Sequence, residues 1–199
     1  MFLKILSHPV LMNLNFHMPL MVDLSHPVVM LEGENGSGKS TLLHSIHYAL
    51  KGEQVEGFAY RWEPAPPKPS QTLLFDAEAH NPSMQLEFFQ DNPQMQEFLQ
   101  MASHGQVMLA MFQENFPSLP DGATLLLDEP EMALSQSNQR RILKMLLELA
   151  EKRNFRIICA THSPILINAK ETYVINMERN INRNVADITM GTQGGSTIQ

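Results

Sequence analysis

Residues 33–41 read Gly-Glu-Asn-Gly-Ser-Gly-Lys-Ser-Thr, and this run satisfies the pattern G-x-x-x-x-G-K-[ST] at every required position. The apolar segment Pro27–Leu31 precedes it, and helical spacing of Leu42, Leu43 and Ile46 follows it. A strand, a glycine-rich turn and a helix in this order aim backbone N–H groups and the positive end of the helix at one anion. The stretch therefore predicts a loop that binds phosphate groups.

The residue types in this loop predict a nucleoside triphosphate with Mg²⁺. Its glycines allow close approach of the backbone, Lys39 offers a charge to the β- and γ-phosphates, and the hydroxyl of Ser40 offers a ligand to Mg²⁺. A chance match in a glycine-rich turn is the alternative, which the flanking strand and helix disfavour. The residues expected to bind ATP here are Asn35, Gly36, Ser37, Gly38, Lys39, Ser40 and Thr41.

A second apolar run, Thr124–Leu127, ends abruptly in the carboxylates of Asp128 and Glu129. Its length fits a strand buried in a parallel sheet, and open α/β sheets bind ligands at the carboxyl edge. We expect Asp128 to hold Mg²⁺ and Glu129 to orient or deprotonate the attacking water. An acidic surface turn is the alternative.

A third strand, predicted over Arg156–Ala160, leads into His162 at the same edge of the sheet. A single histidine is usually structural, but this position at a strand end favours a catalytic role. The expected catalytic residues are therefore Lys39, Glu129 and His162. His44 and His47 lack further ligands at a convincing spacing, so we interpret them as ordinary surface or partly packed histidines.

Composition limits the classes of function. The net charge of −7 argues against a large sequence-independent affinity for nucleic acid, so nucleic acid is possible as a partner but is not indicated. The sequence contains no apolar run long enough to span a bilayer and no secretory leader, which predicts a cytoplasmic protein without a transmembrane segment. Cys159 is the only cysteine and is expected in the core.

The remaining segments predict one α/β domain over residues 1–199. Short antiparallel strands are expected at residues 2–6 and about 12–18, around a turn at Ser7-His8-Pro9. Residues 52–71 are expected to form a loop because they are rich in proline, with Trp62 as a hydrophobic anchor. An amphipathic helix is expected at about 136–152 and a strand at 173–177.

Two further expectations concern the first strands and the end of the chain. Phe16 is the better placed of the early aromatic side chains to stack on adenine, although core packing is the more common use of a phenylalanine. A return strand is expected to end near Met190, and residues 191–199 are expected to form a flexible tail.

Together these motifs resemble the ABC-type ATPase superfamily, and within it the soluble branch that includes SMC-like repair ATPases and small bacterial or phage ATPases. Ala133-Leu134-Ser135 is similar to the D-loop, and Ala102-Ser103-His104-Gly105-Gln106 to the signature, which reads Leu-Ser-Gly-Gly-Gln in transporters. The resemblance implies a P-loop NTPase fold with a mainly parallel central sheet flanked by helices and an N-terminal antiparallel β element. It also implies a reduced helical subdomain at about 79–112.

The resemblance also implies an ATP-dependent dimer of two copies, or of this chain and a related ATPase. In such a dimer Ser103, Gly105 and Gln106 of one subunit would cap the ATP held by Lys39 of the other. The family places a glutamine after the strand that follows the P-loop helix. This chain has Glu78 at that strand end, and we expect Glu78 to face the metal or the water.

Three functions remain open at this point. The leading one is an ATP-hydrolysing switch whose dimerisation acts on a separate effector protein, in DNA maintenance or in conflict between phage and host. The second is the ATP-binding subunit of a membrane transporter, which the altered signature and the short helical insert disfavour. The third is a nucleotide-binding structural module without hydrolysis, which intact Lys39, Asp128, Glu129 and His162 disfavour.

Overall fold

A computed structural model describes residues 1–14, 16–64, 71–77, 104–132, 134–178 and 181–184. Its elements, in chain order, are β1 (Phe2–Ser7), α1 (Pro9–Asn13), β2 (Leu20–Asp23), β3 (Val28–Glu32), α2 (Lys39–Lys51), β4 (Ala59–Glu63), β5 (Thr72–Asp76), α4 (His104–Ser118), β6 (Thr124–Asp128), α5 (Gln136–Arg153), β7 (Arg156–Ala160), α6 (Pro164–Ile167), β8 (Tyr173–Asn176) and β9 (Ile181–Asn184).

The central sheet has the strand order β5-β6-β7-β3-β8-β9. The first five strands are parallel, and β9 is antiparallel to β8. Asp76 pairs in register with Asp128, which in turn pairs with Ala160. This register brings the carboxyl ends of β5, β6 and β7 to one edge, where each strand is followed by a polar segment.

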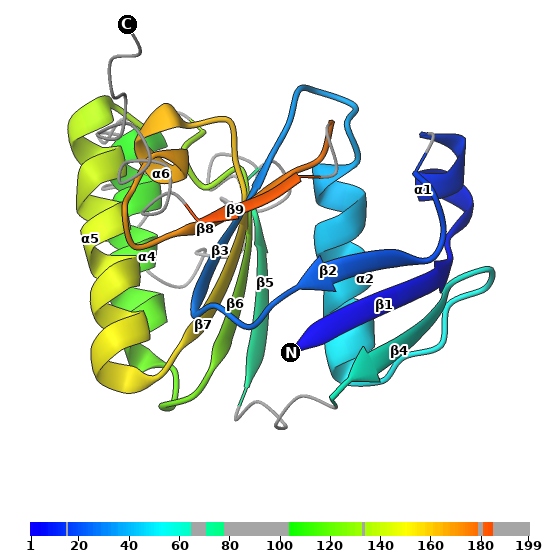
Figure 1. The fold of residues 1–199 in the computed structure, drawn as a ribbon. Helices are drawn as coiled ribbons and strands as arrows, with labels where there is room; N and C mark the ends of the chain where they lie inside the picture. The colour runs from blue at the N-terminus through cyan, green and yellow to red at the C-terminus, as the bar shows by residue number, and fades with distance from the viewer. Residues whose placement is uncertain (15, 65–70, 78–103, 133, 179–180, 185–199) are drawn as a thin grey trace, which may run out of the picture.

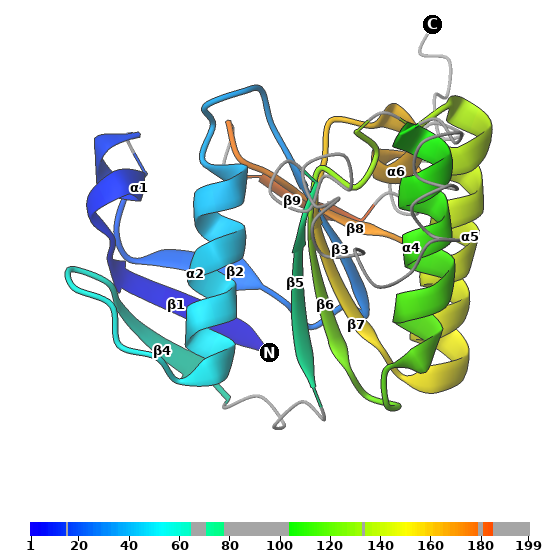
Figure 2. The same cartoon turned by 180° about the vertical axis from the view of Figure 1, so that it is seen from behind.

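Helices cover both faces of this sheet (Figures 1 and 2). Alternate residues of β3, β6 and β7 point to opposite faces, because successive side chains of a strand do so. Met30, Leu127 and Cys159 pack with α4, α5 and α6 in one core, whereas Leu31, Leu126 and Ile158 pack with α2 in the other. The predicted α/β fold with a mainly parallel, helix-flanked sheet is confirmed.

The N-terminal antiparallel element exists, but its second strand was predicted at the wrong residues. Residues 9–13 form helix α1, and the strand that pairs with β1 is β2, with Leu3 opposite Val22. His8 does not turn the chain between two strands. Its Nδ1 accepts a hydrogen bond from the backbone N–H of Leu11, and Pro9 fills the first helical position, so these residues start a helix.

The expected loop at residues 52–71 contains a strand that the sequence analysis missed. Strand β4 pairs with β1 and forms an edge of the three-stranded sheet, in the order β2-β1-β4. Tyr60 and Trp62 point toward the core that contains α2, while Arg61 between them is exposed. The indole N–H of Trp62 donates to the carbonyl of Ala49 at 3.3 Å, consistent with its interpretation as an anchor.

The later elements follow the predictions closely. Ser135 caps helix α5, because its hydroxyl accepts from the N–H of Asn138, and the helix buries Ile142, Leu146 and Leu149. The cysteine, Cys159, is fully buried in β7, where burial raises the pKa of its thiol.

Among the described residues no helix combines the length and the apolar character needed to span a membrane.

Candidate functional site

The loop between β3 and α2 keeps a tight conformation through its glycines. Gly38 caps α2 with φ +92°, and a Cβ there would lie 3.0 Å from Cδ1 of Leu14. At Gly33 a Cβ would lie only 2.4 Å from the hydroxyl oxygen of Ser37. Side chains at these two positions would therefore distort the loop and displace the N-terminal end of α2, which follows it.

Lys39 is almost fully buried beneath this loop, with 4% of its surface exposed. Its Nζ donates to the carbonyls of Gly33 at 2.9 Å and Glu34 at 3.1 Å, and it lies 2.8 Å from Nε2 of His162. Because an ammonium has only donors, Nε2 accepts in this contact. Burial lowers the pKa of Lys39, while the carboxylates of Glu129 and Asp128 oppose that shift.

Ser40 and Asp128 meet across the sheet edge. The hydroxyl of Ser40 donates to Oδ1 of Asp128 at 3.0 Å, although the two residues are 88 positions apart in the chain. Only 7% of Asp128 is exposed, and burial raises the pKa of its carboxyl, with Asp76 and Glu129 adding to the effect. A hydroxyl beside a buried carboxylate supplies the oxygen ligands that Mg²⁺ prefers.

Glu129 follows Asp128 in a left-handed backbone conformation, with φ 47°. Its N–H donates to the carbonyl of Ala160 at 2.9 Å, which holds this conformation against the preference of a residue with a Cβ. Its Oε1 lies 3.4 Å from Nε2 of His162. The three residues predicted to be catalytic, Lys39, Glu129 and His162, are thus brought together from three separate elements.

Glu131 also supports this group, and sequence analysis missed it. Its Oε1 accepts from the backbone N–H of His162 at 2.6 Å and from that of Ser163 at 3.1 Å. These bonds tie the segment after β6 to the segment after β7, and they fix the backbone that carries the His162 imidazole. A carboxylate three residues after Asp128 gave no sequence signal, because its partners lie far along the chain.

A cavity of about 310 Å³ opens over the loop. The residues that line it are Val10, Leu14, Asn35, Gly36, Gly38, Lys39, Ser40, Thr41 and Glu129. The ammonium of Lys39 and the glycine backbone of the loop border this cavity and fit a phosphate ligand.

The side of this cavity next to α1 is aliphatic. Val10 and Leu14 line it, and both are substantially exposed, whereas Phe16 is 8% exposed and belongs to the core. This burial excludes the stacking of Phe16 on adenine, which the sequence had left open. It packs behind the loop, with its ring 3.7 Å from the position of a Cβ on Gly38.

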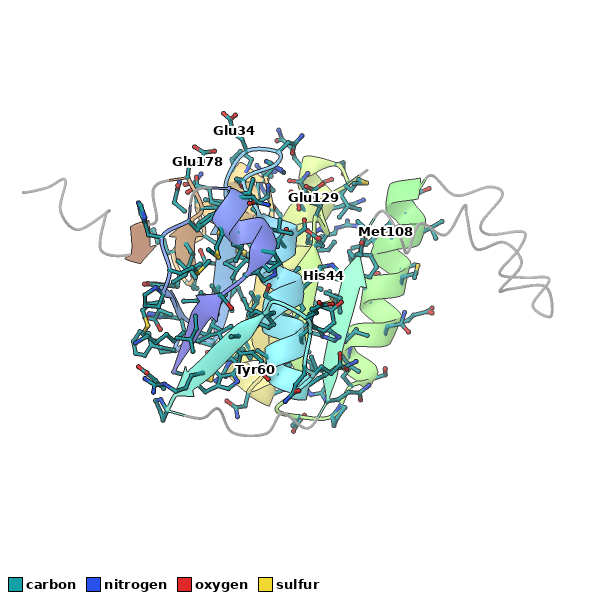
Figure 3. The ribbon with its side chains drawn as sticks, turned by 90° about the vertical axis from the view of Figure 1, so that its right-hand side faces the viewer. Glu34, His44, Tyr60, Met108, Glu129 and Glu178 are labelled. Carbon is teal, nitrogen blue, oxygen red and sulfur yellow. The ribbon has the colours of Figure 1, made fainter. Side chains whose placement is uncertain are left out.

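A smaller cavity of about 220 Å³ lies beside Asp128 and is lined by Ser40, His44, Asp76, Asp128, Glu129 and Met132. His44, expected from the sequence to be a surface or partly packed histidine, is half-buried and shares this cavity with two strand-end carboxylates. Figure 3 shows His44 on α2 below Glu129, on the side of the helix that faces β5. The sequence could have suggested it, since His44 follows Ser40 by one helical turn.

Some predicted residues lie elsewhere or outside the described residues. Gly105 and Gln106 lie in the first turn of α4, on the face of the sheet opposite α2 and away from the loop of their own chain (Figure 2). Ser103, Glu78, Ala133, most of the predicted helical subdomain and residues 191–199 fall outside the described residues. At the end of β5 the residue in register with Asp128 is Asp76.

Sequence comparisons match this chain to a family model and to an ATP-binding protein. A family model described as "AAA domain, putative AbiEii toxin, Type IV TA system" matches residues 116–168. The molybdate import ATP-binding protein MolC of Haemophilus influenzae is 27% identical over 175 residues, which cover 76% of this chain and 68% of that protein.

Solved structures agree with the fold. A metal-chelate type ABC transporter in an inward-facing conformation superposes with a TM-score of 0.56 at 21% identity, over 94% of this chain and 84% of that one. The cbiO1 subunit of a Clostridium perfringens ABC transporter gives a TM-score of 0.53 at 15% identity, over 96% and 91% of the two chains. These two likenesses show the fold that the chain shares with these proteins, and the sequence matches support its placement in the ABC-type P-loop ATPase superfamily.

Proposed function

We propose that this chain, which has the fold of the ABC-type P-loop ATPases, binds ATP with Mg²⁺ and hydrolyses it. One observation carries the proposal: Ser40 and Asp128, far apart in sequence, are hydrogen-bonded at 3.0 Å beside the cavity that holds Lys39 and Glu129. This is the juxtaposition that a phosphate-binding loop and a strand-end acid need in order to act on one metal–phosphate group.

The loop and the α1 side of the cavity would bind the nucleotide. The backbone of Asn35 to Thr41 would surround the phosphates, and Lys39 would exchange its bonds to loop carbonyls for phosphate oxygens. Ser40 and Asp128 would hold Mg²⁺, and bound Mg²⁺–ATP supplies the phosphoanhydride together with the cation that offsets its charge. Val10 and Leu14 would cover the base and ribose side of the cavity by apolar contact.

Hydrolysis would depend on Glu129 and His162. Glu129 would accept a proton from water as the water oxygen bonds to the γ-phosphorus and the bond to the β–γ bridging oxygen breaks, which gives ADP and phosphate. Once Lys39 turns from Nε2 of His162 to the phosphates, the tautomer with a proton on Nε2 would donate to the Glu129 carboxylate 3.4 Å away and orient it. Glu131 would act as a positioning residue through the backbone of His162.

We also propose that two such chains, or this chain and a related ATPase, close on ATP. The first turn of α4 with Gly105 and Gln106 lies on the face opposite α2, so a second subunit would have to present that segment to this loop. ATP held from both sides has a differential affinity for the closed pair that ADP lacks, as a switch requires. The pair would then act on a separate effector protein.

A membrane transporter is the second candidate for what the ATPase drives. The similarity to a molybdate import ATP-binding protein favours it, whereas the family model of a toxin–antitoxin ATPase favours the effector switch. Purification from native membranes separates the two: a stable complex with a membrane permease would establish the transporter role, and its absence alongside a cytoplasmic effector complex would exclude it.

The experiment that tests the enzyme activity is phosphate release by purified protein with ATP and Mg²⁺. We expect steady turnover by the wild type and a decrease of about 10²–10⁴-fold in Glu129→Gln, since that is the usual contribution of a general base. Lys144→Ala, which changes a lysine with 80% of its side chain exposed, serves as the control and should match the wild type.

The opposite result would be clear. If the wild type binds ATP but no assembled form of it releases phosphate, hydrolysis is excluded and the nucleotide-binding structural module becomes the function. Equal rates for the wild type and Glu129→Gln would remove Glu129 from the proposed mechanism.

A further inference from the structure

Three side chains with ligating atoms converge beside the phosphate loop. They are His44 of α2, Asp76 at the end of β5 and Asp128 at the end of β6, and one ligand atom from each lies within 4.8 Å of the others. Atoms that coordinate one ion at about 2.1 Å lie about 3–4 Å from each other. Small rotations of these side chains would therefore bring all three onto one metal.

Rigid elements hold the three residues. Asp76 and Asp128 are paired in the parallel register of β5 and β6, and the N–H of Ala77 donates to the carbonyl of Asp128 at 3.1 Å. His44 lies four residues after Ser40, which contacts Asp128, so both side chains leave α2 on the same face. Ligands on helices and strands hold their geometry better than ligands on loops.

The space and the charges between these residues suit a cation. The cavity that they line has a volume of about 220 Å³. Asp76 and Asp128 both line it, and Asp128, which is more than nine-tenths buried, accepts a hydrogen bond from Ser40. Because Asp128 is buried and Asp76 raises its pKa, a divalent ion between them would lower the energy of the site.

We propose that His44, Asp76 and Asp128 bind a divalent transition-metal ion of the Mn²⁺, Co²⁺ or Zn²⁺ class in the absence of nucleotide. Imidazole nitrogen is a good ligand for these ions, whereas Mg²⁺ favours oxygen ligands and retains its water. Preference over Mg²⁺ is therefore expected. The inference deepens the proposed ATPase function, because Asp128 belongs to both sites, but it requires no ATP.

Titration of Mn²⁺ into the metal-stripped, untagged, nucleotide-free chain tests the proposal, with free Mn²⁺ measured by electron paramagnetic resonance. We expect one bound Mn²⁺ for each wild-type chain and at least about tenfold weaker binding in His44→Gln and in Asp76→Asn, since each loses a direct ligand. His47→Gln, the same change three residues along α2, is the matched control. Circular dichroism checks that every variant is folded.

Pulsed paramagnetic resonance then identifies the ligand, because a bound imidazole couples its nitrogen to Mn²⁺. The coupling should be present in the wild type and in His47→Gln and absent from His44→Gln. Three outcomes would overturn the proposal: no binding without ATP at about 1 mM Mn²⁺ (about −4 kcal/mol), equal binding by wild type and His44→Gln, or equal affinity for Mg²⁺. Phosphate release is measured separately, so failure of either proposal is distinguishable from failure of the other.

Discussion

The buried position of Asp128 favours the binding of a cation, and it lowers the free energy of unfolding of the ligand-free protein. Its carboxylate is buried, and the carboxylates of Asp76 and Glu129 lie near it, so burial and repulsion both raise its pKa. A group whose pKa is higher in the folded state than in the unfolded state favours folding only while it is protonated. At neutral pH the ionised Asp128 therefore lowers the free energy of unfolding of the ligand-free protein.

From this sign we predict that Asp128→Asn melts at a higher temperature than the wild type at neutral pH without ligands. The amide retains an oxygen that can accept from Ser40 and removes the buried charge. In a chain of this size each 1 kcal/mol corresponds to about 2–4 °C. The difference should shrink as pH falls through the pKa of the folded state, because the wild-type carboxyl then becomes protonated.

Calorimetry at several pH values measures this prediction, with Glu148→Gln as a control for net charge. Glu148 is 46% exposed and faces Lys144 and Lys152 on α5, so its loss should change stability by no more than about 0.5 kcal/mol. A lower melting temperature for Asp128→Asn at neutral pH would show that Asp128 stabilises the ligand-free fold.

At the scale of elements, the site depends on contacts between segments that follow different strands. The segment after β6 carries Glu129 and Glu131, and the segment after β7 carries His162 and Ser163. Glu131 joins the two segments through its bonds to the N–H groups of His162 and Ser163. The backbone that presents the imidazole is thus held from a neighbouring strand end.

We predict that Glu131→Ala lowers kcat for ATP while KM changes little. Loss of the shared acceptor leaves the N–H of His162 without this partner, at a cost of about 1 kcal/mol in the free energy of unfolding, whereas the N–H of Ser163 keeps its bond to the hydroxyl of Thr161 at 3.0 Å. Glu131→Gln keeps an acceptor oxygen and should retain most of kcat. Steady-state kinetics and urea unfolding of both variants measure these effects. An alanine variant with normal kcat would remove the positioning role.

At the scale of the whole molecule, the loop and the first turn of α4 lie on opposite faces of the sheet (Figures 1 and 2). One chain cannot bring both to the same ATP as they stand. Closure of a second subunit on the loop would complete the site, and hydrolysis would release it. The positions of the loop and α4 therefore connect the proposed ATP hydrolysis with a proposed change between separate and paired subunits.

The mass in solution of Glu129→Gln tests this assembly. We predict a change from monomer to dimer only with ATP and Mg²⁺, because the variant should bind ATP without turning it over. Adding Lys39→Ala should abolish the change, since the ammonium of Lys39 is expected to contact the phosphates. Light scattering coupled to size exclusion measures it. If ATP binds and the mass stays constant, self-dimerisation is excluded and a second chain must complete the site.

Local sequence alone predicts the phosphate loop, the acid pair at Asp128 and the strand-end position of His162. Each depends on a few consecutive residues whose conformation is local: glycine turns, buried strands and the helix that follows. The same locality predicted β7 and α5 closely, because their hydrophobic periodicity is regular.

Which distant groups come into contact depends instead on how the segments pack in the folded chain. The register of β5 with β6 places Asp76 opposite Asp128, and the face of α2 that carries His44 lies beside them. Glu131 joins the site through bonds to residues 31 and 32 positions away. Strand β4 lies beside a proline-rich segment, and it is stabilised by pairing with β1, which is distant in the sequence. Helix α1 begins where Nδ1 of His8 accepts a hydrogen bond from the N–H of Leu11. Such contacts depend on packing between segments, which no short window of sequence contains.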